Sequence, residues 1–282
     1  MKITIGTAQF GLKYGISNAK GIPNDYELEK IFDSAKNHGI LNLDTHSIYG
    51  NAENRIGKLG KRRFNIISKF SEVNSIKELN LGLSNSLRRL KLDSIYGYLA
   101  HDANSLIKTP LIWKGLLELK KSGNVEKIGY SLYYPDQLNQ LLQLGFLPDL
   151  VQLPYSILDR KFDRYLKILK SHKTEIHVRS VFLQGLYFMN PNELPKKLWP
   201  LQESLLEIQK VCTDENYSVA KAVLNYVVSN PYIDQLVIGI DSVKQLDENI
   251  DLISNWQPNK EFISKLESIN VKDKSLLNPS NW

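Results

Sequence analysis

The amino-acid sequence predicts an α/β fold, a single (β/α)8 TIM barrel with parallel strands, as one domain over residues 1–282. Short apolar runs typical of strands alternate eight times with longer segments whose apolar residues recur every three or four positions, as on one face of a helix. No linker or shift in composition interrupts the alternation, and 282 residues is a usual length for one such barrel. A doubly wound open sheet is the alternative, which eight regularly spaced strands disfavour.

The predicted strands are nearly continuous apolar runs without a polar face, as expected when both sides of a parallel sheet are buried. They cover residues 3–11, 40–45, 64–70, 94–102, 125–131, 150–156, 175–182 and 235–240. The predicted helices cover residues 23–39, 52–61, 75–92, 110–123, 135–145, 161–172, 201–212, 218–230 and 242–254. Gly39, Gly123 and Gly145 mark helix ends, and Pro135 marks a helix start.

The composition indicates a soluble, cytoplasmic protein. No apolar run reaches the roughly 20 residues that cross a bilayer, and the first residues lack the apolar core of a secretory signal. A single cysteine, Cys212, excludes an internal disulfide framework. The formal net charge of +6 comes mostly from basic residues scattered along predicted helices. We therefore expect no membrane and no nucleic-acid partner, and a positive field that attracts a small anionic ligand.

Four side chains with acid–base chemistry fall where predicted strands end. Asp44 ends the second strand, Lys69 the third and His101 the fourth. Tyr49 lies in the loop after the second strand. The strand ends of a parallel barrel share one face, so we expect the four side chains to converge there. A buried lysine needs a carboxylate partner, and Asp44 on the adjacent strand is the candidate.

This combination predicts a site that gives a proton to an oxygen atom. A free tyrosine has a pKa of about 10, too high for an efficient acid near neutral pH. A nearby ammonium such as Lys69 lowers that pKa because it stabilises the phenolate, and a neutral imidazole such as His101 can orient a carbonyl oxygen. Reduction of a carbonyl by hydride transfer needs such a site. The alternative of a metal site formed by Asp44, His46 and His101 is disfavoured, because no further ligands accompany them at recognisable spacing.

The chain resembles the aldo-keto reductase superfamily over its whole length. "LDTHSIYGNAE" is similar to the family's Asp-Thr/Ser-Ala-x-x-Tyr-Gly-x-x-Glu stretch, and "SKF", "AHDA", "VQLPYS" and "IGIDSVKQLDENI" follow in the family's order. The resemblance implies that Tyr49 is the general acid, that Lys69 and Asp44 tune it, and that His101 positions the substrate carbonyl. His46 stands where the family usually has a small residue, and we expect it to line the substrate pocket with Tyr49 and His101.

The same resemblance implies NADP or NAD as cofactor, held in an extended form across the strand ends. No G-x-G-x-x-G spacing is present, so we expect no Rossmann-type glycine turn. Ser131 and Gln152 match positions that hydrogen-bond the nicotinamide carboxamide. The other cofactor positions lie at the end of the first strand, along the loop of the seventh strand, and in the eighth-strand segment that holds the adenosine. They are Thr7, then Arg179, Ser180, Phe182 and Gln184, then Gly239, Ser242, Gln245, Glu248 and Asn249.

Several of these positions depart from the family pattern. Arg179 stands where many members stack a tyrosine on the nicotinamide, and a guanidinium can also stack on an aromatic plane. Leu132 replaces a common asparagine. Gln245 stands where NADPH-specific members have an arginine for the 2′-phosphate and Gly239 where some have a lysine, although Lys244 offers a charge nearby. We therefore expect NADH and NADPH to bind within about tenfold of one another.

The sequence favours reduction of an aldehyde or ketone, sugar-derived or anionic, to an alcohol. The chain lacks the long insertion and extended tail that in some relatives close over aromatic or steroid substrates, and a more open, polar pocket suits carbonyls of carbohydrate biosynthesis. The alternative is a non-catalytic barrel that acts as a binding or regulatory subunit, as channel-associated relatives do. The complete set of four acid–base residues disfavours this alternative. The sequence does not predict the oligomeric state.

Overall fold

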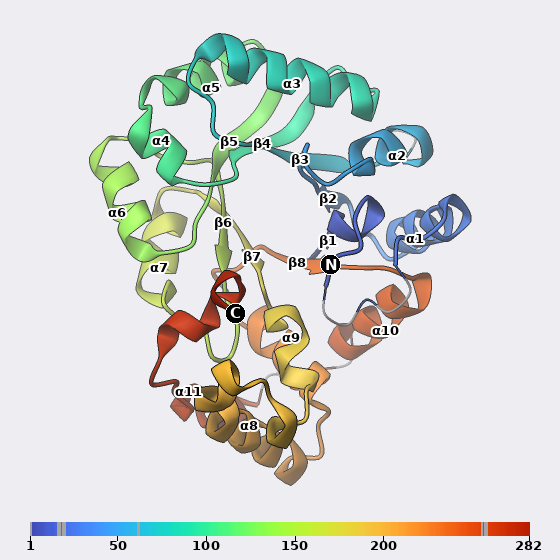
Figure 1. Cartoon of the computed structure of the whole chain (residues 1–282), viewed down its shortest axis with the longest axis vertical. Coiled ribbons are helices and arrows are strands. Elements are labelled where there is room, and N and C mark those ends of the chain that lie inside the picture. Colours follow the sequence, from blue (N-terminus) through green and yellow to red (C-terminus); the bar gives the residue numbers. More distant parts are fainter. Residues whose placement is uncertain (1, 16–17, 19–20, 61–62, 255, 257–258) are drawn as a thin grey trace.

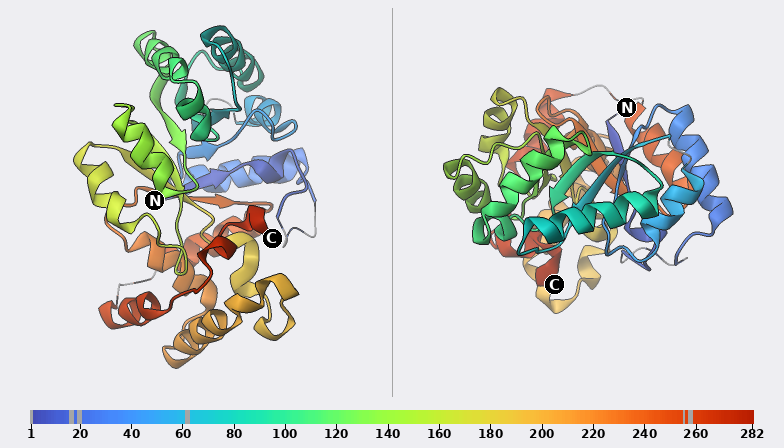
Figure 2. Two further views of the ribbon diagram at one scale, coloured as in Figure 1. Left: turned by 60° about the vertical axis from the view of Figure 1, so that its left-hand side comes forward. Right: turned by 90° about the horizontal axis from the view of Figure 1, so that it is seen from above.

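Eight parallel strands form a closed barrel in the computed structural model, which describes residues 2–15, 18, 21–60, 63–254, 256 and 259–282. The strands follow one another around the barrel in chain order, and β8 pairs with β1 to complete it. Helices surround the barrel on its outer side (Figure 1, Figure 2). The predicted (β/α)8 barrel is confirmed.

The strands are short, and most of them stop before the end of the predicted apolar run. They are β1 Ile3–Gly6, β2 Asn42–Asp44, β3 Asn65–Phe70, β4 Ile95–Ala100, β5 Val125–Ser131, β6 Leu150–Pro154, β7 Glu175–Arg179 and β8 Gln235–Gly239. The largest difference is at β1, where the predicted strand continues to residue 11. The chain instead turns after Gly6 into a short 3-10 helix, η1 (Ala8–Phe10), that buries Phe10.

The predicted helices are all present, with ends that differ from the prediction by at most two residues. The helices are α1 Asp25–Asn37, α2 Ala52–Leu59, α3 Ile76–Leu90, α4 Asn104–Lys108, α5 Leu111–Lys121, α6 Pro135–Gln143, α7 Asp163–Ser171, α8 Gln202–Asp214, α9 Val219–Val228, α10 Val243–Ser254 and α11 Lys260–Ser268. The sequence prediction missed α4, α11 and the 3-10 helices η2 (Leu183–Phe188), η3 (Pro191–Glu193) and η4 (Lys196–Leu201) between β7 and α8. The last residue of the helix predicted over 52–61 lies outside the described residues.

Local chemistry explains where several helices begin and end. The side chains of Asn24 and Ser75 accept the backbone N–H groups of the third residue of α1 and of α3, which satisfies donors that have no partner inside the helix. Pro135 opens α6, where its missing N–H costs nothing. Gly39 and Gly123 follow α1 and α5 with φ of 69° and 78°, a left-handed conformation that glycine adopts without a Cβ clash.

The interior of the barrel is more polar than we expected from the apolar runs in the sequence. Most of the apolar core lies between the barrel and the helices, whereas Ile67, Leu99 and Leu150 form a small separate cluster. Side chains two residues apart on a strand share a face, so Lys69 follows Ile67 and Gln152 follows Leu150 on the inner side. The prediction that the strands lack a polar face is therefore wrong. Their inner faces carry the charged and amide groups that build the site.

No helix in the described part of the chain is long and apolar enough to cross a membrane. The connection from β7 to α8 is the longest irregular one, and it carries the three 3-10 helices η2, η3 and η4. In the view of Figure 1, α8, α9 and α11 lie together at one end of the molecule, and α8 packs against both α9 and α11. The loops at the carboxyl ends of the strands surround the cavity described next.

Candidate functional site

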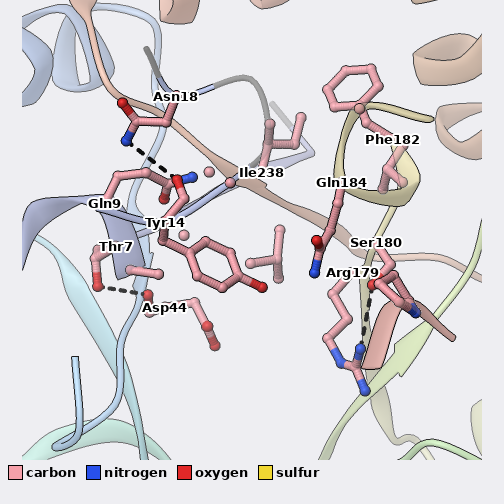
Figure 3. Close-up of a pocket in the computed structure, with 18 of the residues that line it drawn as sticks. Thr7, Gln9, Tyr14, Asn18, Asp44, Arg179, Ser180, Phe182, Gln184 and Ile238 are labelled. Carbon is pink, nitrogen blue, oxygen red and sulfur yellow. Dashed lines mark hydrogen bonds between the residues drawn. The ribbon is translucent and has the colours of Figure 1, made fainter. Parts of the chain in front are cut away.

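A cavity of about 420 Å³ opens at the carboxyl ends of the strands. It extends from the ends of β4 and β5 to the first turns of α10, and Figure 3 shows part of its lining. Most of the residues predicted for the site line it. They are Thr7, Asp44, Tyr49, His101, Ser131, Gln152, Arg179, Ser180, Phe182, Gln184, Gly239, Gln245 and Asn249. Lys69, His46, Ser242 and Glu248 do not line the cavity.

Lys69 lies beneath the cavity and is paired with Asp44. Its side chain is 1% exposed, and Nζ donates to Asp44 Oδ1 at 2.6 Å and to the carbonyl oxygen of Thr45 at 3.1 Å. Gln152 Nε2 donates to the other carboxylate oxygen of Asp44 at 2.8 Å. Burial lowers the pKa of Lys69, and the Asp44 carboxylate opposes that change. The pair predicted from adjacent strands is therefore present, and Gln152 is directed to Asp44 as well as to the cavity.

Tyr49 stands on the cavity wall in the loop after β2. Burial raises the pKa of its hydroxyl above the usual value, and the negative charge of Asp44 adds to this, whereas the Arg179 guanidinium lowers it. From the sequence we expected Lys69 to lower the pKa of Tyr49 below that of free tyrosine. In the structure the pKa of Tyr49 is raised instead. The physical reason is that the Lys69 ammonium is balanced by Asp44, while little water reaches the hydroxyl. Tyr49 therefore keeps its proton at neutral pH.

His101 follows β4 and lines the same cavity. Burial lowers its pKa to about 4, and the positive charges of Lys69 and Arg179 contribute to this change. The imidazole is therefore neutral at physiological pH and can donate one N–H group to an oxygen in the cavity. This agrees with the neutral imidazole expected from the sequence.

His46 is packed behind His101 instead of on the cavity wall, where the sequence led us to expect it. Its side chain is 1% exposed, and its ring meets the His101 ring edge-on with 4.6 Å between centroids. The backbone N–H of Ile48 donates to His46 Nδ1 at 2.9 Å, so the neutral ring carries its proton on Nε2. Nε2 has no hydrogen-bond partner among the described residues. Burial lowers the pKa of His46 to about 3, with His101 and Lys69 contributing.

The loop after β7 forms one side of the cavity. Arg179 Nη2 donates to the Leu132 carbonyl oxygen at 3.0 Å, and its guanidinium lies 4.3 Å from the centre of the Tyr133 ring. Arg179 Nη1 also donates to Ser180 Oγ at 3.3 Å. Ser180 and Gln184 have φ of 60° and 53°, left-handed conformations that are strained for residues with a side chain. Such strain is concentrated at binding sites, where the surrounding structure holds it in place.

The N-terminus of α10 forms the far end of the cavity. Gln245 Oε1 accepts the backbone N–H of Asp241 at 2.9 Å, and Ser242 Oγ accepts the N–H of Gln245 at 3.4 Å. Glu248 is exposed and lies 3.7 Å from Lys244 Nζ on the next turn. Ser242 therefore caps the helix, and Glu248 faces away from the cavity. Of the predicted adenosine positions, those on the wall are Gly239, Gln245 and Asn249.

Sequence reasoning missed the loop after β1. Gln9, Tyr14 and Asn18 line the cavity, and Figure 3 shows the Tyr14 ring extending from their side toward Arg179 and Gln184. Gln9 lies across Gly239, since a Cβ at that glycine would fall 2.3 Å from Gln9 Nε2. Gln9 Oε1 is buried, and the described residues offer it no hydrogen bond. The sequence offered little indication of this loop, because we predicted that the first strand continues to residue 11, whereas β1 ends at Gly6.

The model of the Aldo/keto reductase family matches residues 2–271. This match covers nearly the whole chain, including the strands that carry Asp44, Lys69 and His101. The chain belongs to the aldo/keto reductase family.

Three of the proteins to which this aldo-keto reductase is similar are distant from it in sequence. It is 24% identical over 270 residues to the uncharacterized oxidoreductase YqkF of Bacillus subtilis, with 86% of this chain and 87% of that protein covered. It is 23% identical over 273 residues to the L-glyceraldehyde 3-phosphate reductase of Escherichia coli K12, with 81% and 78% covered. The holo form of the aldo-keto reductase AKR11C1 from Bacillus halodurans shares the fold, with a TM-score of 0.78, 19% identity and 95% and 91% of the two chains covered.

Taken together, the site of this aldo-keto reductase offers a protonated phenol and a neutral imidazole to one cavity. The buried Lys69–Asp44 pair adjoins this cavity, and the Arg179 guanidinium also lines it. Within the described ranges, no three His, Cys, Asp or Glu side chains are grouped so that they could hold a metal ion. Asp44 is instead directed to Lys69 and Gln152. The arrangement can donate hydrogen bonds and a proton to an oxygen that gains negative charge.

Proposed function

We propose that this aldo-keto reductase reduces a small aldehyde or ketone to an alcohol with NADH or NADPH as hydride donor. The observation that carries the proposal is that Tyr49 and His101 line the same cavity as Asp44, whose carboxylate is paired with the buried Lys69. The tyrosine holds a proton and the histidine is neutral, which is the state that both need in order to act on a carbonyl oxygen. The membership of the family supports an oxidoreductase that acts on carbonyls.

In this proposal the carbonyl oxygen accepts hydrogen bonds from the Tyr49 hydroxyl and the His101 imidazole. A nicotinamide held in this cavity would supply the hydride for the new C–H bond. As the oxygen becomes negative, Tyr49 transfers its phenolic proton to it, the C=O bond becomes CH–OH, and the phenolate regains a proton from solvent. Arg179 favours the phenolate by its charge. Lys69 acts on Tyr49 by balancing Asp44, because an unpaired carboxylate would hold the proton more tightly.

The residues that line the cavity support an extended dinucleotide as its ligand. Ser131, Gln152 and Arg179 would hold the nicotinamide end, Ser180 to Gln184 the pyrophosphate, and Gln245 with Asn249 the adenosine end. Gln9 Oε1 is buried, and no described residue donates a hydrogen bond to it. A ribose hydroxyl or an amide group of the cofactor would supply that hydrogen bond. Thr7 also lines the cavity, and its hydroxyl donates to the Asp44 carbonyl oxygen at 2.9 Å.

The substrate class that we propose is a polar or anionic carbonyl derived from a sugar. Arg179 puts a fixed guanidinium on the cavity wall, and guanidinium groups bind carboxylate and phosphate well. The name of one relative, L-glyceraldehyde 3-phosphate reductase, describes a substrate of this kind. A role in carbohydrate metabolism inside the cytoplasm is part of the same proposal.

The proposal is tested by following oxidation of NADH and of NADPH with three aldehydes: glyceraldehyde, glyceraldehyde 3-phosphate and benzaldehyde. We expect saturable turnover, with the highest kcat/KM for the phosphorylated aldehyde. Fluorescence titration with each nucleotide separates binding from turnover. Binding without reduction of any aldehyde would favour the alternative of a non-catalytic barrel. Absence of nucleotide binding would reject the proposed function altogether.

A further inference from the structure

The loop after β1 and the loop that carries Tyr49 approach one another backbone to backbone. A Cβ added at Gly11 would collide with the Tyr49 carbonyl oxygen and lie 2.8 Å from the backbone nitrogen of Ala52. A Cβ added at Gly50 would collide in turn with the Gly11 carbonyl oxygen, and Gly50 has a φ of 54°. Only glycine allows so close an approach, because any other residue would place a side chain in this contact. The backbone of Tyr49 is therefore packed directly against Gly11.

Arg55, near the start of α2, fastens the loop after β1 in this position. Its side chain is 11% exposed, and Nη1 donates to the Phe10 carbonyl oxygen at 2.7 Å. Nη2 donates to the Pro23 carbonyl oxygen at 2.6 Å, so one guanidinium holds the chain at residue 10, directly before Gly11, and again at residue 23. Nε and Nη2 also donate to Asp25 Oδ1, at 3.0 and 2.9 Å. The carboxylate fixes the guanidinium while the guanidinium fixes the two carbonyl groups.

The loop that Arg55 holds also forms part of the cavity wall. Gln9 and Tyr14 line the cavity from this loop, as Figure 3 shows, and Tyr49 lines it from the loop after β2. The contact at Gly11 thus joins two parts of the same wall. Gly11 and Arg55 themselves are not among the residues that line the cavity. A change at either residue can therefore reach a ligand there only through the residues that they hold.

We propose that Gly11 and Arg55 are positioning residues for the general acid Tyr49, an inference that rests on the proposed function. Gly11 lets the loop after β1 reach the Tyr49 backbone, and Arg55 keeps the loop in that place. Lys69 and Asp44 act on the charge around the acid, whereas Gly11 and Arg55 determine where its hydroxyl lies. A reacting group displaced by about 1 Å can cost about 100-fold in rate. Loss of this support should therefore slow proton transfer without moving the pH–rate profile.

The test is a double-mutant cycle that introduces Gly11→Ala or Arg55→Met into the wild type and into Tyr49→Phe. Reduction of the fastest of the three test aldehydes is followed in single turnovers, with enzyme in excess, at a temperature where every variant is folded. In the wild-type background we expect each change to reduce the rate about tenfold, with an unchanged midpoint of the pH–rate profile. In the Tyr49→Phe background the same change should cost less than about twofold, because the acid that it positions is absent.

Two matched controls belong to the same part of the chain but do not touch this contact. A Cβ at Gly57 would collide with the Arg89 carbonyl oxygen of α3, so Gly57→Ala imposes a comparable clash there. Arg63 donates to the Gly60 carbonyl oxygen at 3.2 Å and to Asp33 of α1 at 2.5 Å, so its partners are also a carbonyl group and a carboxylate. Gly57→Ala and Arg63→Met should lower the melting temperature and leave the turnover rate unchanged.

Should Gly11→Ala not fold, Arg55→Met carries the test, since it adds no atom to the contact between the loops. Wild-type rates in a folded Arg55→Met enzyme would overturn the inference while leaving the proposed function intact. Equal losses in the wild-type and Tyr49→Phe backgrounds would also overturn it, because the change would then act on the cavity and not on the acid. If the wild type reduces none of the aldehydes, the inference fails together with the proposed function.

Discussion

Two charged clusters lie inside the barrel at opposite ends of its strands, and they are used differently. The upper cluster, Lys69, Asp44 and Gln152, lies at the carboxyl ends. The lower cluster, Glu175, His177, Lys127 and Tyr96, lies toward the amino ends, where the other three side chains all contact the Glu175 carboxylate. The small apolar cluster of Ile67, Leu99 and Leu150 separates them, with Tyr96 packed against it.

The two clusters solve the same physical problem. A charge without water is costly unless opposite charges and hydrogen bonds surround it, and each cluster gives its carboxylate at least two donors. Only the upper cluster adjoins the cavity with Tyr49 and His101, and no member of the lower cluster lines that cavity. The comparison teaches that a buried carboxylate needs such partners wherever it lies, and that the cluster serves chemistry only where it adjoins the reacting groups.

The largest effect should come from Tyr49→Phe. The variant loses the transferable proton and keeps the ring, so kcat should fall about 100-fold or more while nucleotide binding persists. Tyr96→Phe is the matched control in the lower cluster, where the lost hydroxyl donates to Glu175 at 2.6 Å. Steady-state kinetics of both variants should show a loss only for Tyr49→Phe. A Tyr49→Phe enzyme with normal kcat would remove Tyr49 from the acid role.

Lys69→Met should rank next. It leaves Asp44 buried beside Tyr49 with its charge unbalanced, which should destabilise the fold by about 3–5 kcal/mol and raise the pKa of the tyrosine further. The midpoint of the pH–rate profile should therefore move to higher pH, and Asp44→Asn should reduce activity less. Lys127→Met, the equivalent change in the lower cluster, should lower the melting temperature without moving the pH profile. Identical pH profiles for Lys69→Met and wild type would contradict the link between the upper cluster and the acid.

Glu175→Gln should affect stability alone. Burial works against ionisation of Glu175, but contacts with His177, Lys127 and Tyr96 prevail and lower its pKa from 4.5 to about 2. A lowered carboxyl pKa stabilises the fold above the unfolded value and loses this effect as pH falls toward the folded value. The variant should lose about 3 kcal/mol at neutral pH, from about 1.4 kcal/mol per pKa unit. Denaturant titrations should show the difference from wild type shrinking between pH 4.5 and about 2.

The exposed Glu126 supplies the control for that measurement, since Glu126→Gln should change stability little at any pH. The kinetic constants of Glu175→Gln should match those of the wild type at temperatures where both are folded. A fall in kcat at such a temperature would show that the lower cluster communicates with the cavity, and the division of roles between the clusters would be lost.

His46→Ala should give the smallest effect. It tests whether a residue that packs behind His101 contributes to the site. The His46 ring supports His101 by an edge-on contact, and such pairs contribute about 0.5–1.5 kcal/mol. We expect kcat/KM to fall by about threefold to tenfold, mainly through KM, because His101 would orient the carbonyl less well. An unchanged KM would mean that His101 is held by its backbone alone.

The sequence predicted the part of the site that depends on strand order. Asp44, Lys69 and His101 lie at the ends of consecutive parallel strands, and in a barrel such ends meet on one face. Their convergence could therefore be deduced without coordinates. The position of His46 could not, because a loop side chain can turn toward the cavity or away from it with the same sequence spacing.

By itself, the sequence determined the alternation of strands and helices, the barrel, and the acid–base residues at its carboxyl face, because periodicity, caps and strand order are local properties of the chain. Only the tertiary structure decided that Gln152 is directed to Asp44, that Arg179 lies over the Tyr133 ring, and that Glu27 occupies the N-terminus of α10. Two of these three contacts join residues more than 100 positions apart. Closure of the barrel brings such residues together. Once packing excludes water from between them, each polar side chain needs a hydrogen-bond partner, and the tertiary structure decides which residue that is.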